Sequence, residues 1–253
     1  MSPRERLIAR ARRATSGEAG DPEQGARSGR GPLDEESERH TRRARNGRLI
    51  GIITVVALVA LIAAALLKNP GGLTGVDPGR KIPPFAVPLA SGSLVGDANV
   101  ATHAHEGASG DVPACSVRGS QVLNVCELAE RGPVVLALFV DGGSCPSVLD
   151  EMQALQASFP GVQFAAVAIK GSRPSLRTLI ARRGLTFPVG IDADGALASL
   201  YKVLSCPQVD FAYPGGRVQS RALLATPTLA SLRARVAALV AASRERGWHG
   251  GSA

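Results

Sequence analysis

The hydrophobic pattern of this 253-residue chain is clearest between Pro133 and Phe159. Val134–Val140 is a continuous apolar run rich in β-branched residues, which predicts a strand buried on both faces. From Cys145 onward the apolar positions recur at helical spacing, and Pro146 suits the first turn of a helix. The pattern therefore predicts a buried strand, a short loop and a helix over Pro146–Phe159, with Cys145 at the junction.

The same change of period continues through the C-terminal two thirds of the chain. Further strands are predicted at Gln121–Val125, Gln163–Ile169, Phe187–Ile191, Gln208–Tyr213 and Val218–Leu224. Further helices are predicted at Cys126–Arg131, Pro174–Arg183, Ala196–Tyr201 and from an N-cap at Thr226 to about Arg246. Alternating strands and helices, then a hairpin and a terminal helix, predict an α/β fold with a mixed β-sheet flanked by helices. Residues 91–111, rich in small side chains, are expected to form a mobile loop.

The N-terminal part shows no such alternation. Residues 1–48 hold too few large apolar side chains to fold, which predicts a disordered basic tail. Residues 49–67 are uncharged and overwhelmingly apolar, and as a helix they would be about 28 Å long, close to the thickness of a hydrocarbon core. We therefore expect a transmembrane helix in the lipid bilayer over residues 49–68, a linker over 69–78, a folded domain over 79–247 and a tail over 248–253.

Charge on either side of the apolar run sets the expected orientation. Arg42, Arg43, Arg45 and Arg48 precede it, whereas Lys68 alone follows closely. The positive-inside rule then places the tail in the cytoplasm and the folded domain outside a cell membrane that the chain crosses once. A cleaved signal peptide is the alternative, but the apolar run is longer than a signal usually has and no small-residue cleavage site follows it.

The net charge of +8 is spread in a way that argues against nucleic-acid binding. Residues 1–48 hold 12 arginines against 8 acidic residues, and residues 69–253 hold 16 basic against 13 acidic residues. The predicted domain is thus close to neutral and has no basic face with interleaved aromatic residues. No nucleic-acid partner is expected.

Cys145 is the first candidate for chemistry. Free N–H groups and the dipole at a helix N-terminus favour a thiolate there. The alternative is that the cysteine serves as a small buried apolar residue. Asp150 and Glu151 follow in the first turns of the same helix, where they complement the dipole and modestly oppose a thiolate.

Three stretches make the predicted domain resemble the thioredoxin-like redoxins. They are Gly79–Leu89, the strand with its cysteine (PVVLALFV followed by CPSVLDEM) and VLSCPQVDFAYPGGRV. The resemblance is greatest to membrane-anchored thiol–disulfide oxidoreductases and to the alkyl hydroperoxide reductase/thiol-specific antioxidant group. It implies a thioredoxin-like sheet and a cis-proline at Pro207. Two departures stand out: Val148 occupies the family's second active-site cysteine position, and the Pro, Thr and Cys spacing of peroxiredoxins is absent.

The same resemblance implies a partner for Cys145. In the thioredoxin-like fold the residue before the cis-proline lies against the active-site cysteine, so Cys206 would face Cys145 with Cα atoms about 4.4–6.8 Å apart. We expect Cys145 to be the attacking thiolate and Cys206 the resolving partner, exchanging disulfides with a protein substrate or redox partner and without a cofactor.

Several alternatives stay open for this pair. The two cysteines could form a permanent disulfide, or two thiolates could bind a soft metal such as Cu(I). The domain would then be a non-catalytic scaffold for a partner protein or a metal. A thiol peroxidase, which would form a sulfenic acid at Cys145, is a third function.

Cys115 and Cys126 are expected to form a structural disulfide. Four cysteines in an oxidising compartment suggest a disulfide framework, and this pairing would stabilise the fold by about 2–3 kcal/mol. Neither residue is predicted at a helix terminus that follows a buried strand, which argues against a redox role. The other connectivities of four cysteines stay open.

The remaining polar candidates are expected to be structural. His103 and His105 are assigned to solvent rather than to a metal. Asp192 and Asp194 resemble the start of a calcium loop but lack its later ligands, so Asp194 is expected to cap the next helix. The exposed face of the helix over Pro174–Arg183 is expected to carry Arg177, Arg182 and Arg183.

Overall fold

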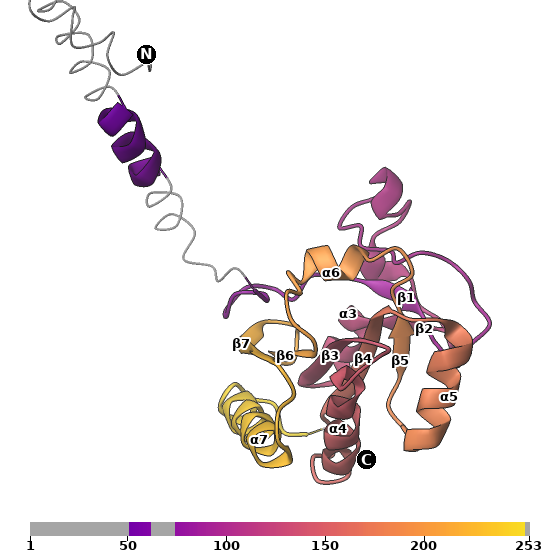
Figure 1. The fold of residues 1–253 in the computed structure, drawn as a ribbon. Helices are drawn as coiled ribbons and strands as arrows, with labels where there is room; N and C mark the ends of the chain where they lie inside the picture. Colours follow the sequence, from indigo (N-terminus) through magenta and orange to yellow (C-terminus); the bar gives the residue numbers. More distant parts are fainter. Residues whose placement is uncertain (1–50, 62–73, 251–253) are drawn as a thin grey trace, which may run out of the picture. The chain divides into compact units, whose positions relative to one another are not determined.

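The computed structural model describes residues 51–61 and 74–250 (Figure 1). The chain divides into two units, Met1–Leu67 and Lys68–Ala253. In the first unit, residues 51–61 are helical. Within the described ranges no helix reaches the length and apolarity needed to cross a bilayer. The predicted tail over 1–48, the rest of the predicted span over 49–68 and residues 69–73 of the predicted linker lie outside the described residues.

The second unit is built on a five-stranded mixed sheet (Figure 1). Its strand order is β5-β4-β3-β6-β7, with β3, β4 and β5 parallel and β6 antiparallel to both of its neighbours. The strands are β3 (Val134–Val140), β4 (Gln163–Lys170), β5 (Val189–Ile191), β6 (Gln208–Ala212) and β7 (Val218–Leu224). The central strand β3 has fully buried residues from Val134 to Phe139, as its unbroken apolar run predicts.

Helices cover both faces of this sheet. One apolar cluster joins Val135, Ala137 and Phe139 of β3 to side chains of α4 (Val148–Gln156), α5 (Arg173–Arg183) and α7 (Leu229–Glu245). The other joins alternate residues of β3 to α3 (Val125–Arg131), α6 (Ala196–Leu200) and the small sheet of β1 (Ala86–Pro88) and β2 (Val122–Asn124). Short 3-10 turns lie at Gly107–Ser109, Ala114–Ser116 and Cys145–Ser147. The sheet flanked by helices on both faces is confirmed.

Two helices have boundaries that differ from the prediction by more than one residue. The helix after Cys145 begins as a 3-10 turn and ends at Gln156, because Pro160 disfavours helical backbone at the residue before it. The N-cap of α7 is Thr228 rather than Thr226: the Thr228 Oγ1 accepts a hydrogen bond from the Ser231 N–H at 3.2 Å. Pro227 therefore precedes the helix instead of opening it.

Arginines on α5 have a structural role that the sequence analysis missed. Arg177 donates to the carbonyl oxygens of Ala90 (3.2 Å) and Gly92 (2.7 Å), and Arg173 donates to those of Leu89 and Gly92. Arg177 is exposed, as predicted, but its guanidinium also makes these backbone hydrogen bonds. These side chains satisfy carbonyl groups of the irregular segment that follows β1.

Both ends of the predicted domain extend further along the chain. The Gly75 N–H, inside the predicted linker, donates to the Lys202 carbonyl at 3.2 Å. At the other end, Trp248 packs against the cluster beneath α7 and its N–H donates to the Ser243 carbonyl at 3.0 Å. Residues 251–253 of the predicted tail lie outside the described residues.

Gly190 on β5 allows the small sheet to approach the large one. A Cβ atom at this position would lie 2.5 Å from Val87 Cγ2 and 3.1 Å from Leu123 Cδ2. We expect Gly190→Ala to lower the free energy of unfolding by about 1–3 kcal/mol, since a buried methyl must displace two packed side chains. Chemical denaturation measures it, with Gly119→Ala as the control because a Cβ there meets no atom within 4 Å. Equal stability of the two variants would contradict this account of the packing.

Candidate functional site

Cys145 lies where the central strand ends. β3 finishes at Val140, a four-residue loop follows, and the Asp141 N–H ties this loop to the Lys170 carbonyl of β4 at 2.9 Å. Cys145 then opens the 3-10 turn that continues directly into α4. The cysteine is 6% exposed and belongs to the apolar cluster beneath α4. Its backbone thus starts a helical segment, where free N–H groups favour an anionic sulfur.

Cys206 lies just before β6, the antiparallel neighbour of β3. The Cys206–Pro207 peptide bond is cis, and β6 begins at the next residue, Gln208. Because β6 runs antiparallel to β3, with Gln208 opposite Leu138, the start of β6 lies beside the end of β3. Cys145 and Cys206 therefore meet: they form a disulfide with their Cα atoms 5.5 Å apart.

One backbone group serves both sulfurs. The Val140 N–H, at the end of β3, donates to the sulfur of Cys145 at 3.3 Å and to that of Cys206 at 3.1 Å. Once the bond is reduced, this N–H is available to whichever sulfur carries the negative charge. Val148, at the position of the family's second cysteine, is fully buried in the core and brings no thiol to the site.

The acidic residues on α4 are partly neutralised. Asp150 forms an ion pair with Arg183 of α5, and its side chain is 53% exposed. Arg183 is thus not simply a solvated residue, as the sequence analysis expected. Because Asp150 would otherwise oppose a thiolate at Cys145, its pairing with a cation removes part of that opposition.

Together these features give the chain a thioredoxin-like fold. The mixed sheet with helices on both faces, the cysteine at the strand-to-helix junction and the cis-proline opening the next strand are the features that the sequence resemblance implies. The connection between β4 and β6 holds α5, β5 and α6.

Comparison with known proteins gives only distant structural matches. No protein-family model matches the chain, and no curated protein does. Among solved structures, a putative thiol:disulfide interchange protein DsbE from Chlorobium tepidum is similar with a TM-score of 0.49 and 18% identity, over 66% of this chain and 98% of that one. A secreted Mycobacterium tuberculosis disulfide oxidoreductase homologous to E. coli DsbE has a TM-score of 0.42 and 22% identity, over 47% and 89%.

A third similar solved structure is named as a peroxidoxin rather than as a disulfide oxidoreductase. Peroxidoxin BcpB from Mycobacterium tuberculosis is similar with a TM-score of 0.46 and 13% identity, over 67% of this chain and 97% of that one. Every one of these identities is below 25% and every TM-score is below 0.5. The class of the protein therefore rests on its own strand order, helical layers and cis-proline.

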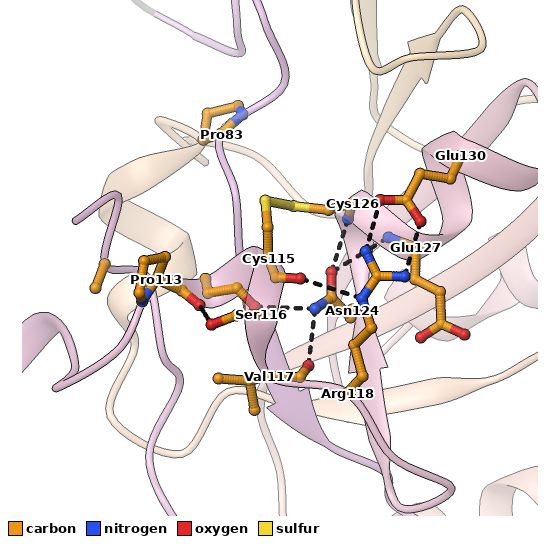
Figure 2. Close-up of a disulfide and its surroundings, with 12 residues drawn as sticks. Pro83, Pro113, Cys115, Ser116, Val117, Arg118, Asn124, Cys126, Glu127 and Glu130 are labelled. Atoms are coloured by element: carbon orange, nitrogen blue, oxygen red, sulfur yellow. Dashed lines mark hydrogen bonds and ion pairs between the residues drawn. A yellow bond between two sulfur atoms is a disulfide. The ribbon is translucent and has the colours of Figure 1, made fainter. Parts of the chain in front are cut away.

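The second disulfide joins Cys115 to Cys126, with Cα atoms 5.3 Å apart (Figure 2). Asn124 holds the same two segments without covalent bonds: its amide donates to the carbonyls of Ala114 and Val117, and its oxygen accepts from the Cys126 and Glu127 N–H groups. Arg118 adds a two-pronged ion pair to Glu130 of α3. A disulfide, the hydrogen bonds of Asn124 and an ion pair therefore all connect the turn that bears Cys115 to the start of α3.

One reason given for a structural role of this pair was wrong. Cys126 does lie in the first turn of a helix that follows a strand, because Asn124 ends β2 and caps α3. The structural assignment depends instead on the surrounding contacts, which hold the two segments together whether or not the sulfurs are joined.

Replacing both Cys115 and Cys126 by serine is expected to lower the free energy of unfolding by about 2–3 kcal/mol, from the loss of a short covalent loop. Disulfide exchange at Cys145 should continue at a similar rate, because Asn124 and Arg118 keep the turn in place. Urea unfolding and a single-turnover exchange assay measure the two quantities. Loss of exchange in a variant that remains folded would show that this pair takes part in the reaction.

The histidine and aspartate candidates are separated in sequence from Cys145 and Cys206. His103 is 85% exposed and pairs with Glu106, whose pKa is lowered to about 2, chiefly by hydrogen bonds from the side chain and backbone of Thr102. The N-cap of α6 is Gly195, so the prediction that Asp194 caps this helix was wrong. The Asp192 carboxylate accepts from the Leu197 N–H of α6 at 3.0 Å. Asp194 instead accepts from the Ala98 N–H. In residues 51–61 and 74–250 no three His, Cys, Asp or Glu side chains gather as a metal site would require.

Sequence reasoning missed a buried polar group on the other face of β6. Asp210 is 1% exposed, and its Oδ2 accepts from Gln208 Nε2 at 2.9 Å. Its Oδ1 and the Gln208 Oε1 have no hydrogen-bond partner within the described part of the chain. Burial raises the pKa of Asp210 to about 7, although the bond from Gln208 opposes the shift. Burial, followed by the charge of Asp210, also raises the pKa of Tyr201 well above its usual value.

Proposed function

We propose that this protein is a thiol–disulfide oxidoreductase whose redox centre is the Cys145–Cys206 pair. The observation that carries the proposal is the disulfide between Cys145, at the strand-to-helix junction, and Cys206, the residue before the cis-proline. One N–H donor, that of Val140, lies within hydrogen-bond distance of both sulfurs. The substrate is a protein or peptide that holds two thiols or one disulfide.

The reaction transfers two electrons. When a substrate dithiol is oxidised to a disulfide, the Cys145–Cys206 bond is broken and both cysteines become thiols, which take up the two protons that the substrate releases. The reverse reaction reduces a substrate disulfide. Val148 leaves the helix without a second cysteine, so Cys206 supplies the second sulfur from another segment of the chain.

A single-turnover assay tests the proposal. Oxidised full-length protein is mixed with a peptide dithiol, and the peptide disulfide is measured together with new protein thiols. One peptide disulfide and two protein thiols per protein molecule are expected. An unreactive disulfide would instead support a non-catalytic scaffold, and rapid formation of a sulfenic acid at Cys145 by peroxide would support a thiol peroxidase.

We further propose that residues 49–68 anchor the protein in a membrane, with residues 79–247 on the extracytoplasmic side. Support comes from the uncharged run over 49–67, from the arginines before it, and from the helix over residues 51–61, whose large apolar side chains are each more than half exposed. Two disulfides suit an oxidising compartment outside the cytoplasm.

Membrane fractionation tests the anchor. The wild-type chain should stay in the membrane pellet after an alkaline wash. The double variant Val56→Asp and Val59→Asp should be released, because each buried charge costs about 2.5–3.5 kcal/mol in a bilayer. Val56→Leu with Val59→Leu is the matched control and should stay in the pellet. Retention of the aspartate variant would contradict the anchor.

A further inference from the structure

The two residues of the Cys145–Cys206 disulfide differ in their access to solvent. Cys145 is 6% exposed and packs in the cluster that contains the fully buried Val148 and Leu149. Cys206 is half-buried, and it lies in a surface segment in which Leu204 is 70% exposed. Because disulfide exchange requires access of a thiolate to one of the two sulfurs, Cys206 is the residue open to attack from solvent.

The two sulfurs also differ as leaving groups. Cys145 opens the helical segment that runs through α4, where the helix dipole and free N–H groups stabilise a thiolate. The backbone of Cys206 leads into strand β6 and starts no helix of its own. A thiol of lower pKa leaves faster in exchange, so this difference favours Cys145 as the leaving sulfur.

The remaining groups do not reverse this order. The Val140 N–H lies 3.3 Å from the Cys145 sulfur and 3.1 Å from the Cys206 sulfur, so it can stabilise a thiolate on either. Of the two acidic residues in the first turn of α4, Asp150 is paired with Arg183, and Glu151 only modestly opposes a thiolate at Cys145. The greater solvent exposure of Cys206 and the greater stability of a thiolate at Cys145 therefore both favour attack on the Cys206 sulfur.

We propose that an incoming substrate thiolate attacks the sulfur of Cys206 and that Cys145 leaves as the thiolate. This assignment rests on the proposed function and reverses the roles expected from the sequence. A bond forms between the substrate sulfur and Cys206 as the Cys206–Cys145 bond breaks, and the electron pair stays on Cys145. The second substrate thiolate then attacks the first substrate sulfur, which releases the substrate disulfide and leaves Cys206 reduced. In the opposite direction, Cys206 is the cysteine that attacks a substrate disulfide.

The test locates the mixed disulfide on the wild-type protein. Oxidised full-length chain is mixed with excess reduced glutathione, quenched in acid within milliseconds, alkylated and digested with trypsin. Cleavage after Lys202 and Arg217 releases Cys206, and cleavage after Arg131 and Lys170 releases Cys145. Mass spectrometry should find at least tenfold more glutathione on Cys206 than on Cys145. A majority on Cys145 would overturn the assignment while leaving the proposed function in place, whereas no adduct on either cysteine would overturn both.

Single variants give a second measurement. Cys145→Ser retains Cys206 and lacks the thiolate that would displace a bound partner, so it should accumulate a stable mixed disulfide with a peptide disulfide. Cys206→Ser retains the buried Cys145 and should accumulate at least tenfold less in the same time. Equal trapping by the two folded variants would contradict the assignment.

Discussion

Replacing Cys145 by serine is expected to lower the rate of peptide-dithiol oxidation by at least about 1,000-fold, to the uncatalysed level. A hydroxyl group cannot form a disulfide with Cys206, so the variant has no bond that can accept the two electrons of the peptide dithiol. The single-turnover assay described above measures the rate. Cys206→Ser is expected to lose activity to the same extent, because the two sulfurs act as one redox unit.

The serine variant also loses a covalent crosslink, which must be separated from the loss of chemistry. Closure of a loop with a sequence separation of 61 residues stabilises a fold by about 4 kcal/mol. The Cys115→Ser and Cys126→Ser double variant is the matched control, since it loses the other crosslink and should keep its activity. Oxidation of the peptide by folded Cys145→Ser protein would show that the electrons pass through another group.

Replacing Asp210 by asparagine is expected to raise the free energy of unfolding by about 4 kcal/mol above pH 8 and to change it little at pH 4. Burial raises the pKa of Asp210 to about 7, against 3.8 for an unperturbed carboxyl group. Between these values the native state holds a proton that the unfolded chain releases, so the stability of the wild-type protein falls as the pH rises and levels off above about 7. Asparagine is neutral at every pH and can still accept the bond from Gln208.

Urea unfolding of the wild type and of Asp210→Asn across pH 4–9 measures this difference. The exposed Asp111→Asn is the control and should follow the wild-type curve. If the Asp210→Asn and wild-type curves were parallel over the whole range, Asp210 would not be the buried acid responsible for the pH dependence.

Much of the fold could be predicted because burial on both faces leaves a direct mark on the sequence. The unbroken apolar run of Val134–Val140 predicted the central strand with both of its ends. The position of α4 followed from a period of 3.6, whereas that of α7 was predicted from a capping threonine that the structure places two residues later. Near Thr226 and Thr228 two residues could each cap a helix, and only the hydrogen bond to Ser231 distinguishes them.

Asp210 could not be placed from the sequence. Polar and apolar residues alternate along β6, with Gln208 and Asp210 on one face and Val209 and Phe211 on the other. Such alternation is typical of a strand with one solvated face. The face is buried here by tertiary contacts: Gln208 donates to the Tyr201 carbonyl, and the Tyr201 hydroxyl donates to the carbonyl of the distant Pro83 at 2.8 Å.

The candidate site depended on a different kind of inference. Cys145 was singled out by its own surroundings in the sequence, as the residue between a buried strand and a helix. Its proximity to Cys206 came from the family resemblance, because no periodicity relates two residues 61 positions apart. The unequal burial of the two cysteines depends on how the loops before Cys145 and Cys206 pack. The hydrophobic pattern of the sequence does not predict this packing.

A peptide map under non-reducing conditions, with and without a mild reductant, tests the redox assignment most directly. Without reductant, both disulfides should appear as linked peptides. With mild reductant, Cys145 and Cys206 should become fully alkylated, while Cys115 and Cys126 stay linked. A Cys145–Cys206 bond that never forms, or one that resists the reductant as fully as the Cys115–Cys126 bond, would contradict the assignment of this pair as the redox centre.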